Sequence, residues 1–234
     1  MHLLHEFRYE QPDPARFYSA LAADSVAQLC DYADLDGARL LDVGGGPGYF
    51  RHAFEGAGAT YFALDSDVGE LAGTGEIGAR TVIGSGMRLP FGDECVDVCY
   101  SSNVLEHVPD PWRMADEMLR VTRPGGTTYV SWTVWFGPWG GHETAPWHFL
   151  GGRYARRRYA RTHGHEPKNK YGESLFALTV GAGLRWARAQ QAGGAAEVVA
   201  LLPRYHPRWS WWLLRIPVLR EVVTWNLVIV LRKR

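Results

Sequence analysis

The chain has 234 residues, of which 46% are hydrophobic and 21% are charged, and its 25 basic residues balance its 25 acidic ones. This length suits one domain with a full core and an added cap, and the composition is that of an ordinary globular protein. Because the chain carries no net charge that would attract nucleic acid, we expect no nucleic-acid partner.

The cysteine content and the uncharged stretches indicate a cytoplasmic protein. The three cysteines, Cys30, Cys95 and Cys99, form no metal-type pair and fit a reducing compartment. The first ten residues lack the basic and apolar regions of a signal peptide. The longest uncharged run, residues 125–141, is interrupted by glycine and proline, so it predicts no membrane span.

The first half of the chain alternates apolar strands with helical segments. Residues 14–32 carry apolar side chains near helical spacing, whereas residues 38–43 form a short apolar run before a glycine-rich turn. Five strands alternating with helices indicate a parallel sheet covered on both faces. The further elements expected here are a helix at 49–56, strands at 60–65, 80–84 and 96–102, a helix at 111–122 and a strand at 127–135.

The alternation stops after Trp135. Residues 136–172 are rich in glycine, histidine, arginine and aromatic side chains, and they predict a long irregular insertion. The fold class is therefore α/β: a seven-stranded, mostly parallel sheet with helices on both faces and an insertion after the fifth strand. Beyond the insertion we expect a helix at 173–184, a strand at 195–205, a helix at 209–223 and a strand at 226–233.

The stretch LLDVGGGPGYF, residues 40–50, joins the first strand to the next helix through a loop dominated by glycine. A phosphate-binding P-loop is excluded because it needs a lysine, and the first lysine of the chain is Lys168. The dinucleotide fingerprint fails at its third position, where Tyr49 replaces the glycine or alanine that lets the helix approach the strand. The pattern that fits is G-x-G-x-G, in which bare backbone approaches a flat, positively charged ligand that has no diphosphate.

Four blocks of sequence together carry a resemblance to a known family. They are LLDVGGGPG (40–48), ALDSD (63–67), MRLPFGDECVDVCYSSNVLEHV (87–108) and EMLRVTRPGG (117–126). In this order and spacing the chain resembles the class I S-adenosylmethionine-dependent methyltransferases, in the ubiquinone/menaquinone-biosynthesis-like branch (methyltransferase type 11). The resemblance covers residues 38–135, and it implies a Rossmann-like methyltransferase sheet and S-adenosylmethionine as the cofactor.

The resemblance also divides the chain, which we expect to form one domain over residues 1–234. Residues 38–135 would be the cofactor-binding half, and residues 136–190 a substrate-side insertion and helix. Residues 195–234 would be a C-terminal strand–helix–strand unit. Since insertions vary while the sheet stays the same, we expect the insertion to select the acceptor.

The strand ends supply the expected cofactor contacts. Asp65 follows Gly44 by 21 residues, where a carboxylate can accept both ribose hydroxyl protons. Asp42 can face the ammonium group of the cofactor. Ser85 stands where the family commonly has an acid that binds the adenine amino group, so we expect altered affinity with binding retained. The full set implied by the resemblance is Asp42, Gly44, Gly45, Gly46, Gly48, Asp65, Ser66, Ser85, Gly86, Met87, Ser102 and Asn103.

Histidines that follow the fourth and fifth strands are the candidates for chemistry on the methyl acceptor. An oxygen nucleophile benefits from a base, and histidine titrates near neutral pH. Parallel sheets bind ligands at the carboxyl ends of their strands, which favours His142 with the adjacent Glu143, and then His107. For each of these residues, an ordinary loop histidine or a pocket-shaping role remains the alternative. His142 and His148 are separated by Pro146 and do not match the helical H-E-x-x-H spacing, so we expect no metal.

Two further segments leave alternatives open. The basic run at 153–165 is either a solvated helical face or a patch for an anionic acceptor. Residues 204–223 are dense in tryptophan and arginine, which suits peripheral membrane contact. The interpretation favoured from sequence is instead a helix buried on the sheet, with tryptophan lining an apolar substrate tunnel.

The leading hypothesis is a methyltransferase that methylates oxygen on a small-molecule, glycan or lipid-linked acceptor with a hydrophobic part. One alternative is carbon methylation of a quinone-like or polyketide ring. An alternative of another class is a cofactor-binding or scaffold protein without turnover. The sequence does not predict the oligomeric state.

Overall fold

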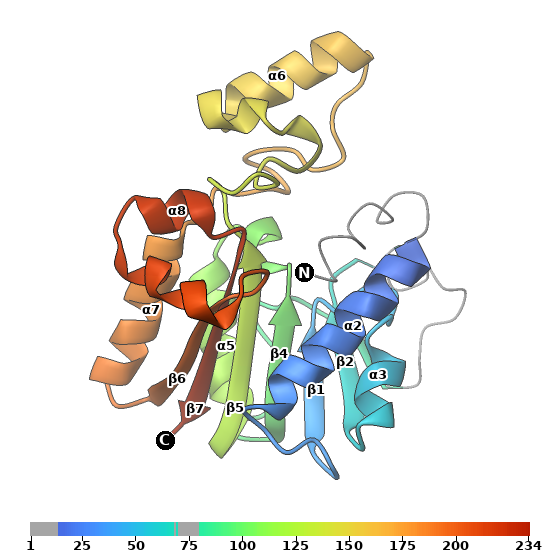
Figure 1. Ribbon diagram of the computed structural model, residues 1–234. Coiled ribbons are helices and arrows are strands. Elements are labelled where there is room, and N and C mark those ends of the chain that lie inside the picture. Colours follow the sequence, from blue (N-terminus) through green and yellow to red (C-terminus); the bar gives the residue numbers. More distant parts are fainter. Residues whose placement is uncertain (1–13, 68, 70–79) are drawn as a thin grey trace.

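The computed structural model describes residues 14–67, 69 and 80–234 (Figure 1). The ten amino-terminal residues, on which the signal-peptide prediction rests, lie outside this range. Among the described residues, no helix is both long enough and apolar enough to cross a membrane.

The centre of the fold is a seven-stranded sheet in the order β3-β2-β1-β4-β5-β7-β6. Neighbouring strands from β3 to β5 pair in parallel, whereas β7 runs antiparallel between β5 and β6. The predicted mostly parallel α/β fold is therefore confirmed. The chain changes direction across the sheet between β1 and β4, and ligands of such sheets bind outside the carboxyl ends of the strands at this point. The strands are β1 (Arg39–Val43), β2 (Thr60–Asp65), β3 (Thr81–Ile83), β4 (Val96–Ser102), β5 (Thr122–Thr133), β6 (Ala196–Pro203) and β7 (Asn226–Lys233).

Helices cover both faces of the sheet, as Figure 1 shows. Side chains alternate along a strand, so Leu40 enters the core under α2 and α3, while Leu41 enters the core under α5 and α7. This alternation explains why β1 is buried on both faces, with Leu40, Leu41 and Val43 apolar and Asp42 as its one buried polar residue. The helices are α2 (Pro14–Cys30), α3 (Arg51–Gly56), α5 (Pro111–Val121) and α7 (Val180–Ala192).

The helix after the insertion begins later than the sequence predicts. Instead of spanning 173–184, α7 starts at Val180. Thr179 caps the helix, because its Oγ1 accepts a hydrogen bond from the Ala182 N–H at 3.2 Å. The apolar residues before it, such as Leu178, are buried in an extended segment, which apolar spacing alone does not distinguish from a helix.

The insertion after β5 consists of short helical turns and one longer helix. They are η3 (His142–Thr144), η4 (Trp147–Leu150) and α6 (Gly152–His163). Figure 1 shows α6 beyond the carboxyl ends of the strands, away from the sheet. The basic run of the sequence lies on this helix, where Arg153, Arg157 and Arg161 are exposed and recur four residues apart on one stripe.

The predicted helix at 209–223 is also wrong. The segment is divided into a 3₁₀ helix, η5 (Arg208–Arg215), and a short helix, α8 (Leu219–Val223). Pro217 lies between them, and proline disfavours helical backbone at the residue before it. The expected burial on the sheet is wrong too, since Trp209 and Trp212 are exposed and only Ser210 and Leu214 of η5 are buried.

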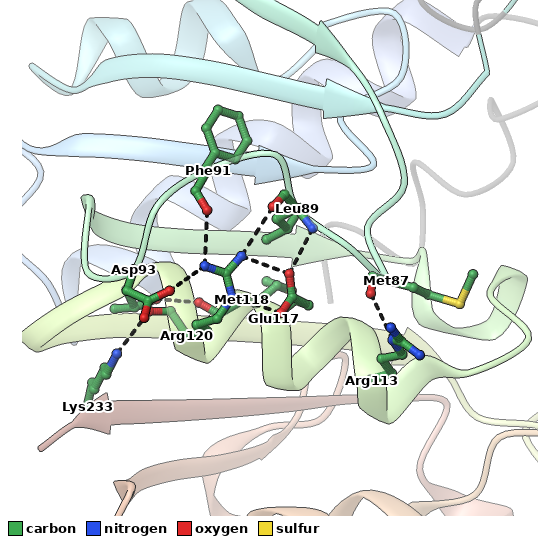
Figure 2. A network of polar contacts seen from close by, with 10 residues as sticks. Met87, Leu89, Phe91, Asp93, Arg113, Glu117, Met118, Arg120 and Lys233 are labelled. Atoms are coloured by element: carbon green, nitrogen blue, oxygen red, sulfur yellow. Dashed lines mark hydrogen bonds and ion pairs between the residues drawn. The ribbon is translucent and has the colours of Figure 1, made fainter.

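Polar contacts tie α5 to the loop between β3 and β4 (Figure 2). Arg120 donates to the Leu89 carbonyl at 3.2 Å and pairs with the Glu117 carboxylate at 2.8 Å. Glu117 accepts the Leu89 N–H at 2.9 Å, and Arg113 donates to the Met87 carbonyl at 3.1 Å. Helix α5 therefore fixes the loop on which the predicted adenine contacts lie.

Replacing Arg120 with methionine should lower the free energy of unfolding by about 2 kcal/mol, because several charge-assisted hydrogen bonds to the loop are lost together. Denaturant titration measures this change. Arg188→Met, on the exposed side of α7, is the matched control and should stay within about 0.5 kcal/mol of the unchanged chain. Equal stability of the two variants would show that these contacts do not hold the loop.

Candidate functional site

The loop after β1 turns at three glycines. Gly44, Gly46 and Gly48 have φ values of 81°, 50° and 83°, a region that glycine adopts without strain. At Gly44 the loop also lies against the side chain of Val104, because a Cβ at this position would be only 2.5 Å from it. The G-x-G-x-G spacing thus corresponds to a bend whose backbone is left uncovered by side chains.

Asp65, the last residue of β2, lies against this loop. Its Oδ2 accepts the Gly46 N–H at 3.0 Å, and its Oδ1 accepts the Asp67 N–H at 2.9 Å. These two bonds orient the carboxylate, which has about four acceptor positions and so retains capacity for further donors such as a vicinal diol. Ser66 is exposed beside it. The structure brings Asp65 and the glycine loop together, and the ribose contact stays a prediction.

Asp42 is buried in β1, directly beside the loop. The Tyr61 hydroxyl donates to its Oδ2 at 2.7 Å, and a Cβ at Gly45 would lie 3.1 Å from the same oxygen. Burial raises the pKa of Asp42 to about 7, and the hydrogen bond from Tyr61 opposes the rise. A nearby cation favours the charged form of a carboxyl, so this group suits the predicted contact with the ammonium of the cofactor.

The residues predicted to surround adenine follow β3. Ser85 is exposed, and its Oγ accepts the Met87 N–H at 3.3 Å. At Gly86 a Cβ would lie 3.0 Å from Met114 Sδ and 3.2 Å from Val43 Cγ1, so glycine lets the loop lie against both α5 and the end of β1. These residues therefore lie at the same edge of the sheet as the glycine loop.

Ser102 and Asn103, at the end of β4, are held by residues that the sequence did not single out. Arg204 donates to Ser102 Oγ at 2.9 Å, and Asn226 donates to Asn103 Oδ1 at 2.6 Å. The Arg204 side chain is fully buried and pairs with Asp24 of α2 at 3.0 Å. An arginine directly after an apolar strand was the available signal, but its partners are distant in the sequence.

A second cluster lies where the insertion meets the ends of β4 and β5. Glu106, His107 and His142 each place one potential ligand atom within 4.8 Å of the others, and the two histidine rings lie edge to face at 5.0 Å. Glu106 Oε1 accepts the Thr133 N–H at 2.9 Å, whereas its buried Oε2 has no hydrogen-bond partner among the described residues. His107 Nδ1 donates to the Ser174 carbonyl at 2.7 Å, so its Nε2 carries the lone pair of the neutral ring.

His142 has the electrostatic properties of a base. Burial lowers the pKa of His142 below its ordinary value of 6.5, and the charge of Glu106 partly offsets this effect. The ring is therefore neutral near pH 7 and can accept a proton. His142 also has a φ of 48°, an uncommon conformation for a residue other than glycine.

Glu143 does not join this cluster. It is exposed, and its Oε1 accepts a hydrogen bond from Asn169 Nδ2 at 2.8 Å. Successive side chains of a 3₁₀ turn point in different directions, so the residue next to His142 in the sequence turns away from it. The carboxylate that lies beside His142 is that of Glu106, and a catalytic role of Glu143 stays a prediction.

The other histidines of the insertion lie elsewhere. His148 is buried, with Nε2 3.1 Å from the Gly137 carbonyl, whereas His163 and His165 are exposed. In the described part of the chain, Glu106, His107 and His142 are the one group whose donors are spaced for a metal ion. The sequence predicts no metal from the spacing of His142 and His148. For the group of Glu106, His107 and His142, the absence of a metal stays a prediction.

A glycine loop after β1, an acid at the end of β2 and a single antiparallel strand next to the last strand of the sheet are typical of class I methyltransferases. A family model described as a methyltransferase domain matches residues 41–130. A chain from Mycobacterium marinum named as an uncharacterized methyltransferase is 53% identical over 244 residues, covering 100% of this chain and 94% of that one. The chain therefore belongs to the S-adenosylmethionine-dependent methyltransferases, and its cofactor is S-adenosylmethionine.

Solved structures with the same fold include both methyltransferases and a protein named for another reaction. An S-adenosylmethionine-dependent methyltransferase from Mesorhizobium loti aligns with a TM-score of 0.61 at 19% identity, covering 90% of this chain and 98% of that one. The cyclase SpnF aligns with a TM-score of 0.54 at 17% identity, covering 90% of this chain and 81% of that one. At these identities the likeness shows the fold alone.

Proposed function

We propose that this methyltransferase acts on a hydroxyl oxygen of an acceptor with a hydrophobic part, which is a small molecule, a glycan or a lipid-linked group. The observation that carries the proposal is the partly buried His142, which is neutral near pH 7, beside Glu106 and His107 at the carboxyl ends of the strands, where the cofactor loop lies. A hydroxyl must lose a proton when it is methylated, and this cluster offers a base to take it.

The reaction is an in-line displacement at the methyl carbon. The bond between carbon and sulfur breaks as the bond between carbon and oxygen forms, and S-adenosylhomocysteine leaves as a neutral thioether. The hydroxyl proton passes to His142, and the negative charge of Glu106 stabilises the resulting imidazolium. Holding the oxygen and the methyl group in line supplies much of the rate.

The hydrophobic part of the acceptor is inferred from aromatic side chains of the segment that carries His142. Trp139 accepts the His142 N–H at its carbonyl and packs edge to face on Trp225, with ring centroids 5.0 Å apart. Phe136, three residues earlier, is 38% exposed at the start of the insertion. Such apolar surface beside a few polar groups is typical of small-molecule sites.

Carbon methylation of a quinone-like or polyketide ring is the alternative within the same chemistry. An activated ring carbon depends less on a local base, so this alternative makes little use of the cluster at His142. The alternative of another class is cofactor binding without methyl transfer, and the shared fold of a protein named as a cyclase makes it worth testing.

The acceptor class can be tested with S-adenosylmethionine carrying an isotopic label in its methyl group. The chain is incubated with polar, lipid and glycolipid fractions of a cell extract, and the labelled product is isolated from the fraction that receives the label. We expect transfer into a fraction of amphipathic molecules. Label only in strictly polar molecules would contradict the hydrophobic acceptor, and binding without any transfer would support the non-catalytic alternative.

The role of Glu106 can be tested through the dependence of rate on pH. The charge of Glu106 raises the pKa of His142, so Glu106→Gln lowers that pKa further and keeps the base neutral to lower pH. We expect the acidic limb of the rate profile to move to lower pH and the plateau to fall by about tenfold, since the imidazolium loses its counter-charge.

The matched control is Glu143→Gln, which changes an exposed carboxylate of the same loop region. This control should leave both the limb and the plateau unchanged. A profile for Glu106→Gln that keeps its original limb would show that Glu106 does not act on the catalytic base.

A further inference from the structure

An exposed apolar ridge, defined here as residues 209–222, projects from η5 and α8. Trp209 is 78% exposed, Trp212 52%, Val218 77% and Val222 51%. Exposed hydrophobic side chains at this density are uncommon on the surface of a soluble protein, and they mark an interaction site. The ridge lies outside the cofactor loop and the cluster at His142.

The opposite side of η5 anchors the ridge to the body of the protein. Ser210 and Leu214 are buried, and the Trp211 indole donates to the His206 carbonyl at 3.1 Å. Residues three apart share a face in a 3₁₀ helix, so Trp209, Trp212 and Arg215 stand together on the outer side. The indoles of Trp209 and Trp212 therefore point outward, because the other face of this 3₁₀ helix is fixed against the protein.

Helix α8 is also fixed in place. Glu221 accepts the Val180 N–H at 2.7 Å and the Gly181 N–H at 2.8 Å, which ties α8 to the start of α7. Between the two anchored parts, Val218 has a φ of 68°, a strained conformation for a β-branched residue. The fold therefore holds Val218 in a strained turn that points its side chain into solvent.

The charged side chains around the ridge indicate which kind of partner it binds. Glu221 is the one acidic residue within 209–222, and both of its carboxylate oxygens accept backbone N–H groups of α7. Arg215 is exposed between Trp212 and Val218, and none of the described ion pairs includes it. Arg208, at the other end, is exposed and paired with Asp31 at 2.9 Å. An apolar surface that presents exposed arginines complements an anionic one.

We propose that residues 209–222 bind the surface of an anionic phospholipid bilayer. The indoles of Trp209 and Trp212 would lie at the headgroup level, where tryptophan is favoured, with Val218 and Val222 reaching toward the acyl chains. Arg215 would contact lipid phosphates. Binding of this kind needs no membrane-spanning helix and brings the enzyme to acceptors held in the bilayer.

The test is co-sedimentation of the full chain with vesicles of phosphatidylcholine alone and of phosphatidylcholine mixed with phosphatidylglycerol. We expect binding to the mixed vesicles and much weaker binding to the neutral ones. The double variant Trp209→Ala/Trp212→Ala should bind mixed vesicles about tenfold less, because two large apolar side chains are lost from the contact. Arg215→Glu should reduce the difference between the two kinds of vesicle.

The control variant is Trp147→Ala, which removes a partly exposed tryptophan of η4 outside the ridge. This control should bind mixed vesicles as the unchanged chain does, and retained binding of S-adenosylhomocysteine verifies that each variant is folded. Absence of vesicle binding by the unchanged chain would overturn the proposal. So would a dimer in size-exclusion chromatography that the double variant abolishes, since the ridge would then join two copies of the chain. Neither result bears on methyl transfer, so this proposal and the proposed function fail separately.

Discussion

Replacing His142 with alanine should lower the rate of methyl transfer to a hydroxyl acceptor by about two to four orders of magnitude, the range typical of a lost general base. The reason is that the acceptor proton then loses the imidazole of His142, the base to which it passes. Burial lowers the pKa of His142, so the unchanged chain should keep its rate as pH falls to 6.5 and lose it only below that value. The affinity for S-adenosylhomocysteine should not change.

Single-turnover rates and equilibrium binding measure these two quantities separately. His163→Ala is the matched control, because His163 is exposed at the end of α6, where it stacks on Tyr159. A rate for His142→Ala within about threefold of the unchanged chain would contradict oxygen methylation through this base. That outcome would favour the carbon acceptor.

Chelation tests the same cluster in another way. If Glu106, His107 and His142 handle a proton, then removing divalent ions should leave the rate unchanged. A rate that falls with a chelator and returns with one added metal would instead assign the three side chains as metal ligands.

Replacing Asp65 with alanine should weaken the binding of S-adenosylmethionine by about a hundredfold or more. Two charge-assisted hydrogen bonds to the ribose would be lost, each contributing about 1.5–3 kcal/mol. The Gly46 N–H would also lose its acceptor at 3.0 Å, so the glycine loop would be less well fixed. The two effects act in the same direction.

Isothermal titration with S-adenosylhomocysteine measures the change in affinity. Asp34→Ala provides the matched control, since Asp34 is an exposed acid in the segment before β1, near the amino ends of the strands. Its affinity should equal that of the unchanged chain. Unaltered binding by Asp65→Ala would show that Asp65 does not bind the ribose.

Much of the fold could be predicted because the relevant signals are local. The apolar run of β1, the glycines after it and Asp65 at the end of β2 lie within one short stretch, and parallel strands bring their carboxyl ends to one edge. The family resemblance rests on the same stretch, with the blocks around β4 and α5. The residues expected on the cofactor side therefore follow from the sequence, and their contacts with the cofactor stay predictions.

The acceptor side was less predictable because its contacts join distant residues. Glu106 was not singled out, since its proximity to His142 depends on how the insertion returns to β4. Arg204 was missed for the same reason, as it contacts Asp24 and Ser102 across three elements. An acid directly before His107 at a strand end was the one available clue to Glu106.

The carboxy-terminal elements were misjudged for a different reason. Apolar spacing at 209–223 fits a buried helix, but Pro217 divides the segment, and Trp209 and Trp212 are exposed. Hydrophobic spacing assumes that apolar side chains seek the core of their own chain. That assumption fails for Trp209 and Trp212, which are exposed.

The central claim is that the transferred methyl group ends on an oxygen atom. Methyl donor enriched in carbon-13 followed by NMR of the isolated product tests it directly, because an oxygen-bound methyl carbon and a carbon-bound one resonate in separate regions. We expect a single enriched methyl signal in the region of methyl ethers. A signal in the region of methyl groups on carbon would contradict it.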